Sequence, residues 1–176
     1  MNTQRPVFSK NISRKWTMTT AYDAPTAALV ESEGVDIVLV GDSVGMVLLG
    51  YDSTVPVTMD EMIHHAKAVR RGTKKTFMIG DLPLKGVRKG PRQALESARR
   101  FVREAGCQAV KLEWNSRCIE SAKLMVKNNI PVMGHVGLTP QSAARRRIVQ
   151  NRRGHMCFEL QQPVTPRLRT GAMIDE

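Results

Sequence analysis

The sequence predicts an α/β fold in which about five βα units build a parallel sheet. Between Trp16 and about Gln141, short apolar runs alternate with longer amphipathic stretches, which is typical of consecutive βα units. Several apolar runs are rich in Val, Ile and Met, as strands covered on both faces should be. A chain of 176 residues, 41% hydrophobic and 24% charged, can bury one sizeable core. We therefore expect a single globular domain.

Each expected strand is short and bounded by polar or turn residues. The apolar runs predict strands at 16–20, 36–40, 76–80, 109–112 and 131–134. An early helix is expected from Pro25 to the neighbourhood of Gly34. No internal repeat is visible beyond the βα alternation itself.

Helix ends can be read from local capping residues. Thr58 and Glu61 have the spacing of a capping box, and Gly72 follows two arginines where that helix should close. Pro91 suits the first turn of a further helix, and Gly106 can take the left-handed conformation that ends it. These signals predict two long helices flanking the third strand.

The pattern divides the chain into three parts. Residues 1–15 form an N-terminal segment, and residues 16–142 form the βα domain. Beyond Ser142 the sequence turns into Arg clusters, scattered Gln and two prolines, without a convincing strand or amphipathic helix. We expect residues 143–176 to be a basic, disordered or irregular tail.

The net charge of +11 is compatible with an anionic small substrate or with nucleic acid. Much of it comes from arginines within the last 34 residues, so a nucleic-acid-binding tail stays open as an alternative, although a disfavoured one. A further alternative is a non-catalytic interaction protein that pairs with another chain.

No apolar run approaches the roughly 20 residues that cross a bilayer, so no membrane association is expected. The cysteines Cys107, Cys118 and Cys157 form no CxxC pair, which favours reduced thiols. We expect a cytoplasmic protein; a mitochondrial location is the alternative, because the first residues are basic and lack acids.

Acidic residues follow the ends of three expected strands. Asp42, Asp81 and Glu113 occupy these positions. In parallel α/β folds ligands collect at the carboxyl ends of strands, and grouped carboxylates favour a hard cation such as Mg²⁺. Taken singly, each acid is better explained as a helix cap or a turn residue, and only the three together favour a metal site.

Lys111 lies two residues before Glu113, so both side chains should point to the same face of the sheet. Such a lysine can bind a substrate carboxylate or form a structural ion pair, and the spacing leaves both open. His135, just past the fifth strand, is a candidate site residue or a structural histidine. His64 and His65 point about 100° apart on a helix and are expected to be surface or packing residues.

Residues Gly41 to Gly45 also satisfy the G-x-S-x-G pattern of a serine hydrolase, with Asp81 and His135 later in the required order. The following Gly50, Ser53 and Pro56 do not suit the helix that should open directly after such a nucleophile. The hydrolase is a disfavoured alternative.

Six segments together resemble one enzyme family in order and spacing. They are Thr20–Asp23, Val40–Met46, Gly50–Thr54, Gly80–Pro83, Val110–Glu113 and Gly134–Ser142. The set is similar to the ketopantoate hydroxymethyltransferases. The resemblance implies a (β/α)8 TIM-type barrel, Mg²⁺ as the metal and a homo-oligomer, a decamer in the family.

The implied reaction is a one-carbon transfer of pantothenate biosynthesis, in the coenzyme A pathway. A hydroxymethyl group passes from 5,10-methylenetetrahydrofolate to 3-methyl-2-oxobutanoate, giving 2-dehydropantoate. By resemblance the metal ligands are Asp42, Asp81 and Glu113, and the oxoacid contacts are Asp42, Ser43, Asp81 and Lys111.

The chain departs from the family pattern at three places. Trp114 and Asn115 stand where the family has glycines, and residues 85–90 differ from its usual segment. The pattern stops near Ser142, so we expect an incomplete barrel of about five βα units, without the family's general-base Glu. Such a sheet should have unpaired edges and an uncovered apolar face.

Overall fold

The computed structural model describes residues 15–136, Gln141 and the strand at 157–161. Its strands are β1 (Met18–Thr20), β2 (Ile37–Val40), β3 (Phe77–Asp81), β4 (Ala109–Glu113), β5 (Val132–Val136) and β6 (Cys157–Gln161). Its helices are α1 (Ala24–Ser32), α2 (Val44–Val47), α3 (Met59–Gly72), α4 (Leu84–Val87), α5 (Pro91–Ala105) and α6 (Cys118–Lys127). Each of the five predicted strands is present.

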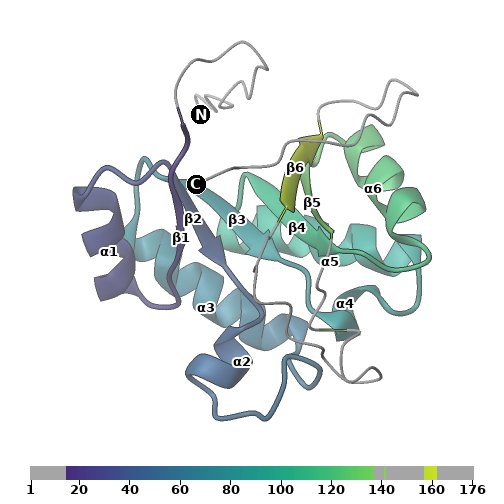
Figure 1. Ribbon diagram of the computed structural model, residues 1–176, viewed down its shortest axis with the longest axis horizontal. Coiled ribbons are helices and arrows are strands. Elements are labelled where there is room, and N and C mark those ends of the chain that lie inside the picture. Colours follow the sequence, from purple (N-terminus) through teal and green to yellow (C-terminus); the bar gives the residue numbers. More distant parts are fainter. Residues whose placement is uncertain (1–14, 137–140, 142–156, 162–176) are drawn as a thin grey trace.

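The sheet has the strand order β1-β2-β3-β4-β5-β6 (Figure 1). The first five strands are parallel and follow one another in sequence order, whereas β6 pairs with β5 in the antiparallel direction. Parallel strands that are neighbours in sequence, each connected through a helix, form the wall of a (β/α) barrel. The protein is therefore a partial TIM-type barrel, as predicted.

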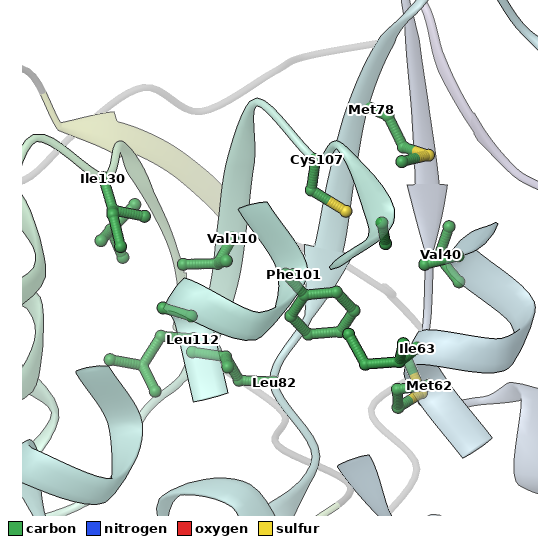
Figure 2. Close-up of a cluster of buried hydrophobic side chains, with 14 of the residues drawn as sticks. Val40, Met62, Ile63, Met78, Leu82, Phe101, Cys107, Val110, Leu112 and Ile130 are labelled. Carbon is green, nitrogen blue, oxygen red and sulfur yellow. The ribbon is translucent and has the colours of Figure 1, made fainter. Parts of the chain in front are cut away.

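The helices pack beside one another along the outside of this wall. Helix α3 contacts α1 and α5 as well as β2 and β3, and α6 contacts α5, β4 and β5. Between helices and sheet lies the larger hydrophobic cluster, in which Phe101 of α5, Met62 of α3 and Met78 of β3 are fully buried (Figure 2). Burial of this layer is the main force that holds the helices to the sheet.

The capping signals acted largely as predicted. Thr58 and Glu61 form the capping box of α3, and Gly106 ends α5 in the left-handed conformation with a φ of 69°. Helix α3 ends at Gly72, as predicted, although this glycine has no positive φ. A Cβ there would lie 2.2 Å from the carbonyl oxygen of Ala24, so glycine permits the close packing of α1 against α3.

The inner face of the sheet carries a second, smaller hydrophobic cluster. Its buried members are Ile37, Leu39, Phe77, Ile79, Ala109 and Met133. None is more than 8% exposed, so the predicted uncovered apolar face is wrong for these residues. The curl of the sheet brings their side chains together from four strands.

The prediction of unpaired edges is wrong on one side of the sheet. Strand β6 pairs along the whole of β5, from Val132 opposite Gln161 to Val136 opposite Cys157. This strand falls in the segment 143–176 for which the sequence predicts an irregular tail. Apart from β6, that prediction concerns residues outside the described part, as does the prediction for residues 1–14.

Candidate metal and oxoacid site

The inner face changes from apolar to ionisable along the direction of the strands. On β3, Ile79 is followed two residues later by Asp81, and on β4, Ala109 is followed by Lys111 and then Glu113. Because side chains alternate along a strand, residues two apart share a face. The polar side chains therefore continue the inner apolar rows at the carboxyl ends of the strands, where barrel enzymes hold their substrates.

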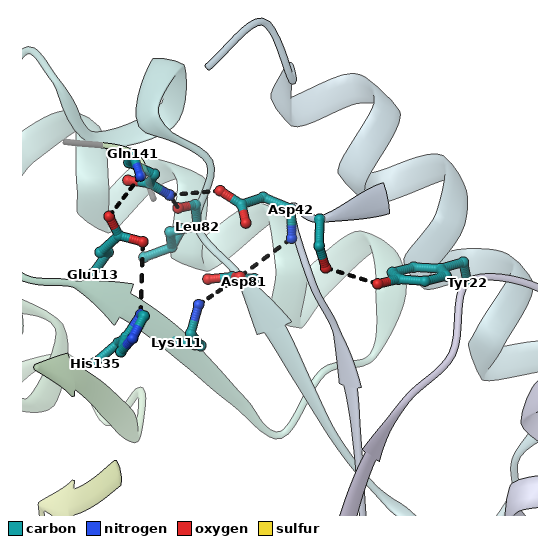
Figure 3. A network of polar contacts seen from close by, with 9 residues as sticks. Tyr22, Asp42, Asp81, Leu82, Lys111, Glu113, His135 and Gln141 are labelled. Atoms are coloured by element: carbon teal, nitrogen blue, oxygen red, sulfur yellow. Dashed lines mark hydrogen bonds and ion pairs between the residues drawn. The ribbon is translucent and has the colours of Figure 1, made fainter. Parts of the chain in front are cut away.

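The register of the sheet sets these residues side by side. Asp81 is directly opposite Lys111 on the neighbouring strand, and Glu113 is directly opposite His135. As whole residues, all four are at most 7% exposed. Figure 3 shows how they gather with Asp42 from the end of β2. The sheet itself thus places the charged groups, with no need for a long loop.

Lys111 is the cation of the cluster. Its Nζ donates to Oδ2 of Asp81 over 2.7 Å. Burial alone would lower the pKa of Lys111, but the carboxylates of Asp81, Asp42 and Glu113 outweigh it, so that its pKa is raised above the ordinary value. Lys111 therefore stays charged at neutral pH.

Asp81 uses one of its two oxygens for these contacts. Its Oδ2 accepts from Lys111 and, over 3.2 Å, from the backbone N–H of Asp42. Its Oδ1 is buried and has no hydrogen-bond partner. An orphaned carboxylate oxygen inside a protein is costly unless something binds it, and a cation is the usual solution.

Asp42 lies directly after β2, in the turn that leads into α2. A Cβ at Gly41 would lie 2.8 Å from Oγ of Ser43, so a larger residue there would require the Ser43 side chain to move. Burial and the charge of Asp81 raise the pKa of Asp42 to about 7, against the opposing effects of Gln141 and Lys111. The site therefore holds more negative charge than Lys111 alone can balance.

Glu113 and His135 complete the cluster on the β4–β5 side. Oε2 of Glu113 lies 3.6 Å from Nδ1 of His135, and the backbone N–H of Trp114 donates to the carbonyl of His135 over 3.0 Å. Asn115 shapes the next turn, since its side chain donates to the carbonyl of Glu113 and accepts from the N–H of Arg117. Trp114 is 52% exposed, and Glu113 lies in the cluster beside His135.

Gln141 is the residue whose role the sequence did not reveal. It is buried, and its Nε2 donates to Oδ2 of Asp42 over 2.7 Å and to the carbonyl of Leu82 over 3.1 Å. Its backbone N–H donates to Oε1 of Glu113 over 2.8 Å. Its place in the segment Gly134–Ser142 was the available signal, but that segment gave no reason to single it out.

Ser43 lies at the outer end of the cluster and shares a hydrogen bond of 2.7 Å with the hydroxyl of Tyr22. Nδ1 of His65 in turn lies 2.8 Å from the carbonyl oxygen of Tyr22. His65 is therefore a packing residue, as predicted, and His64 is exposed. Tyr22 extends the candidate site to the end of β1.

The hydrolase alternative finds no support in this geometry. Ser43 has φ −56° and ψ −15°, an ordinary helical conformation rather than the strained one of a nucleophile elbow. Its hydroxyl contacts Tyr22, and His135 faces Glu113. Cys107 and Cys118 are free and buried, in agreement with the predicted reduced thiols; the side chain of Cys157 lies outside the described residues.

The structure thus brings together Asp42, Asp81, Lys111 and Glu113, with Ser43 beside them. In the described part of the chain, however, no three His, Cys, Asp or Glu side chains stand close enough to enclose one ion. Mg²⁺ usually takes one or two protein carboxylates and keeps water or substrate oxygens for the rest. Asp42 and the orphaned oxygen of Asp81 fit that requirement.

Comparison with known proteins places the chain in a family. A profile of ketopantoate hydroxymethyltransferase matches residues 2–157. The chain belongs to the ketopantoate hydroxymethyltransferase family. It is 53% identical over 125 residues to the 3-methyl-2-oxobutanoate hydroxymethyltransferase of Geobacillus thermodenitrificans. The matched stretch covers 71% of this chain and 45% of that protein. The corresponding protein of Desulfotalea psychrophila is 52% identical over 138 residues, 78% of this chain and 50% of that protein.

This hydroxymethyltransferase family member spans about half the length of the curated relatives it matches. Among solved structures, phosphoenolpyruvate phosphomutase from Streptomyces platensis shares the fold with a TM-score of 0.56 at 16% identity, over 69% of this chain and 48% of that protein. Within the described residues no helix is long and apolar enough to span a membrane.

Proposed function

We propose that this chain carries the oxoacid- and metal-binding part of a 3-methyl-2-oxobutanoate hydroxymethyltransferase. The reaction is transfer of a hydroxymethyl group from 5,10-methylenetetrahydrofolate to 3-methyl-2-oxobutanoate, giving 2-dehydropantoate in pantothenate synthesis. The observation that carries the proposal is the single buried network of Asp42, Asp81, Lys111 and Glu113 at the carboxyl ends of β2, β3 and β4. The names of the relatives support the same reaction.

Mg²⁺ fits the donor set of this network. Asp42 and Asp81 would hold it. The charge of Asp81 raises the pKa of Asp42 more than the charge of Glu113 does, which places the first two carboxylates closer together, and Oδ1 of Asp81 has no hydrogen-bond partner. Glu113, which is connected to Asp42 through Gln141, would be the third acid of the metal site. The ion would supply the positive charge that stabilises an enolate oxygen of the oxoacid.

Protein groups then bind and orient the substrate. Lys111 stays charged among the carboxylates and offers a cation to the oxoacid carboxylate, while Ser43 offers a hydroxyl held by Tyr22. The burial of Asp81, Lys111 and Glu113 keeps bulk water from the reacting carbon, which strengthens each of these interactions.

The test measures binding of 3-methyl-2-oxobutanoate in the presence of Mg²⁺ by isothermal titration calorimetry, together with formation of 2-dehydropantoate. Asp81→Asn should weaken oxoacid binding by at least about tenfold, since it removes the charge that holds both Lys111 and the ion. Asp60→Asn is the matched control, because Asp60 is an exposed acid at the start of α3. Equal binding by wild type and Asp81→Asn would refute the proposal.

A further inference from the structure

Gln141 connects two carboxylates that belong to different strands. Its side chain reaches Asp42, 99 residues earlier in the chain, and its backbone N–H reaches Glu113. The two bonds start from different groups of one buried residue, so they fix the distance between the end of β2 and the end of β4. In the described part of the structure, this is the residue that hydrogen-bonds both acids.

The orientation of the Gln141 amide is determined by its partners. Both side-chain contacts, Oδ2 of Asp42 and the carbonyl of Leu82, are acceptors, and one NH₂ group has two protons to give. A flipped amide would set its own oxygen against two oxygens. The group therefore acts as a double donor anchored on the backbone of Leu82, which holds Oδ2 of Asp42 in a defined direction.

Donation by a neutral amide also suits the charge of this cluster. Three buried carboxylates share one buried lysine. An additional cation at position 141 would compete for them, and an additional acid would repel them. Gln141 satisfies an oxygen of Asp42 and leaves the negative charge in place.

We infer that Gln141 is a positioning residue, which turns Asp42 toward Asp81 and keeps Glu113 beside them so that a divalent cation can bind. This inference rests on the metal site of the proposed function. Groups that orient metal ligands in this way typically change metal affinity by about 10–100-fold when they are removed. The Glu113 bond comes from the backbone and survives side-chain substitution, so mutations report on the Asp42 bond.

The experiment measures the affinity of the purified chain for Mn²⁺ by electron paramagnetic resonance, with thermal unfolding recorded in parallel. Gln141→Leu removes both side-chain donors at similar size and should weaken Mn²⁺ binding about 10–100-fold. Gln141→Asn keeps an amide on a shorter side chain and should bind Mn²⁺ better than Gln141→Leu. It also serves as the second variant if the leucine variant does not fold.

Gln108→Leu is the matched control. The amide oxygen of Gln108 accepts from the backbone N–H of Met78 over 2.8 Å and from Arg70, away from the carboxylates. Its loss should lower the unfolding temperature without changing Mn²⁺ affinity. Equal loss of affinity in Gln108→Leu would mean that general destabilisation causes the effect, and would overturn the inference.

The outcomes separate this inference from the proposed function. If wild type binds Mn²⁺ and both Gln141 variants bind it equally well, the positioning role is wrong while the metal site stands. If folded wild type does not bind Mn²⁺, the metal site itself is wrong and the inference falls with it. Selective weakening in Gln141→Leu supports both.

Discussion

Nζ of Lys111 lies 2.7 Å from Oδ2 of Asp81, and the two side chains are only 8% and 2% exposed. The residues are directly opposite each other on β4 and β3, so the register of the sheet forms the pair. Two buried charges of opposite sign stabilise each other strongly, because either charge alone would have neither a counter-ion nor water around it.

Lys111→Met should destabilise the protein by about 3–5 kcal/mol at neutral pH, because it leaves the buried charge of Asp81 uncompensated. Urea unfolding measures the change. The double variant Asp81→Asn/Lys111→Met removes both charges and should recover most of the loss. A double variant no more stable than Lys111→Met would show that the pair is not energetically coupled.

Asp42→Asn should stabilise the metal-free protein above neutral pH. The pKa of Asp42 is raised from 3.8 to about 7, so between those values the folded state binds a proton that the unfolded state has lost. The free energy of unfolding therefore falls as pH rises through this window, and asparagine removes the fall. At pH 8 the gain should be on the order of a few kcal/mol, shrinking toward pH 4. Parallel stability curves for the two proteins would contradict this.

Glu31→Gln should weaken the protein above about pH 4.5 and have little effect near pH 2. The carboxylate of Glu31 accepts from the N–H groups of Lys74, Lys75 and Thr76. Burial opposes ionisation, but these bonds outweigh it and lower the pKa of Glu31 from 4.5 to about 2. The stability it contributes is present above the unfolded pKa and lost as pH falls through the folded one.

At pH 7 we expect Glu31→Gln to lower the free energy of unfolding by about 1–2 kcal/mol. The loss is no larger because the carboxylate is partly exposed and its charge is screened by solvent. Denaturant unfolding at pH 7 and at pH 2 measures it. Glu33→Gln, an exposed acid just after α1, is the control and should change little. Similar losses in both variants would argue against a specific role for Glu31.

Gly80→Ala should destabilise the protein by about 1–3 kcal/mol through overpacking. A Cβ at this position would lie 2.5 Å from Cδ1 of the fully buried Phe101. Adding Phe101→Leu makes room, so the double variant should lose less than the sum of the single losses. Thermal unfolding of the four proteins tests this, and strict additivity would show that the two positions do not clash.

Tyr22→Phe should weaken binding of the oxoacid about 2–10-fold, the value of one hydrogen bond, because Ser43 loses the partner that orients its hydroxyl. Calorimetry in the presence of Mg²⁺ measures it. Tyr51→Phe is the control, since the hydroxyl of Tyr51 donates to Glu61 at the start of α3. Unchanged binding in Tyr22→Phe would separate Tyr22 from the site.

The parts of the fold that depend on local sequence could be predicted. Alternating apolar runs located the parallel strands, and Thr58 and Gly106 marked helix ends, because capping acts within a few residues. The role of Gly72 depends on its approach to Ala24, 48 positions earlier, and such contacts leave no local pattern. The short helices α2 and α4 and the strand β6 were likewise missed, since none carries a clear periodic signal.

The candidate site was predictable where its residues follow directly from the strands. Asp81 and Glu113 end strands, and Lys111 shares a face with Glu113, so the βα pattern gathers them. Gln141 and Tyr22 could not be found this way, because their roles come from hydrogen bonds to distant residues. Whether Asp42, Asp81 and Glu113 bind metal, and whether folate and a decamer are involved, stay predictions.

The change from apolar to ionisable side chains along the inner face has a practical consequence for engineering this protein. Ile79 and Asp81 are two residues apart on one rigid strand, as are Ala109 and Lys111. Substitutions that repack the apolar residues of the inner face would therefore also shift the charged side chains on the same strands and alter ligand affinity. Variants meant to raise heat resistance without that side effect should be sought on the solvent-facing sides of α5 and α6, at exposed positions such as Val102 and Ile119.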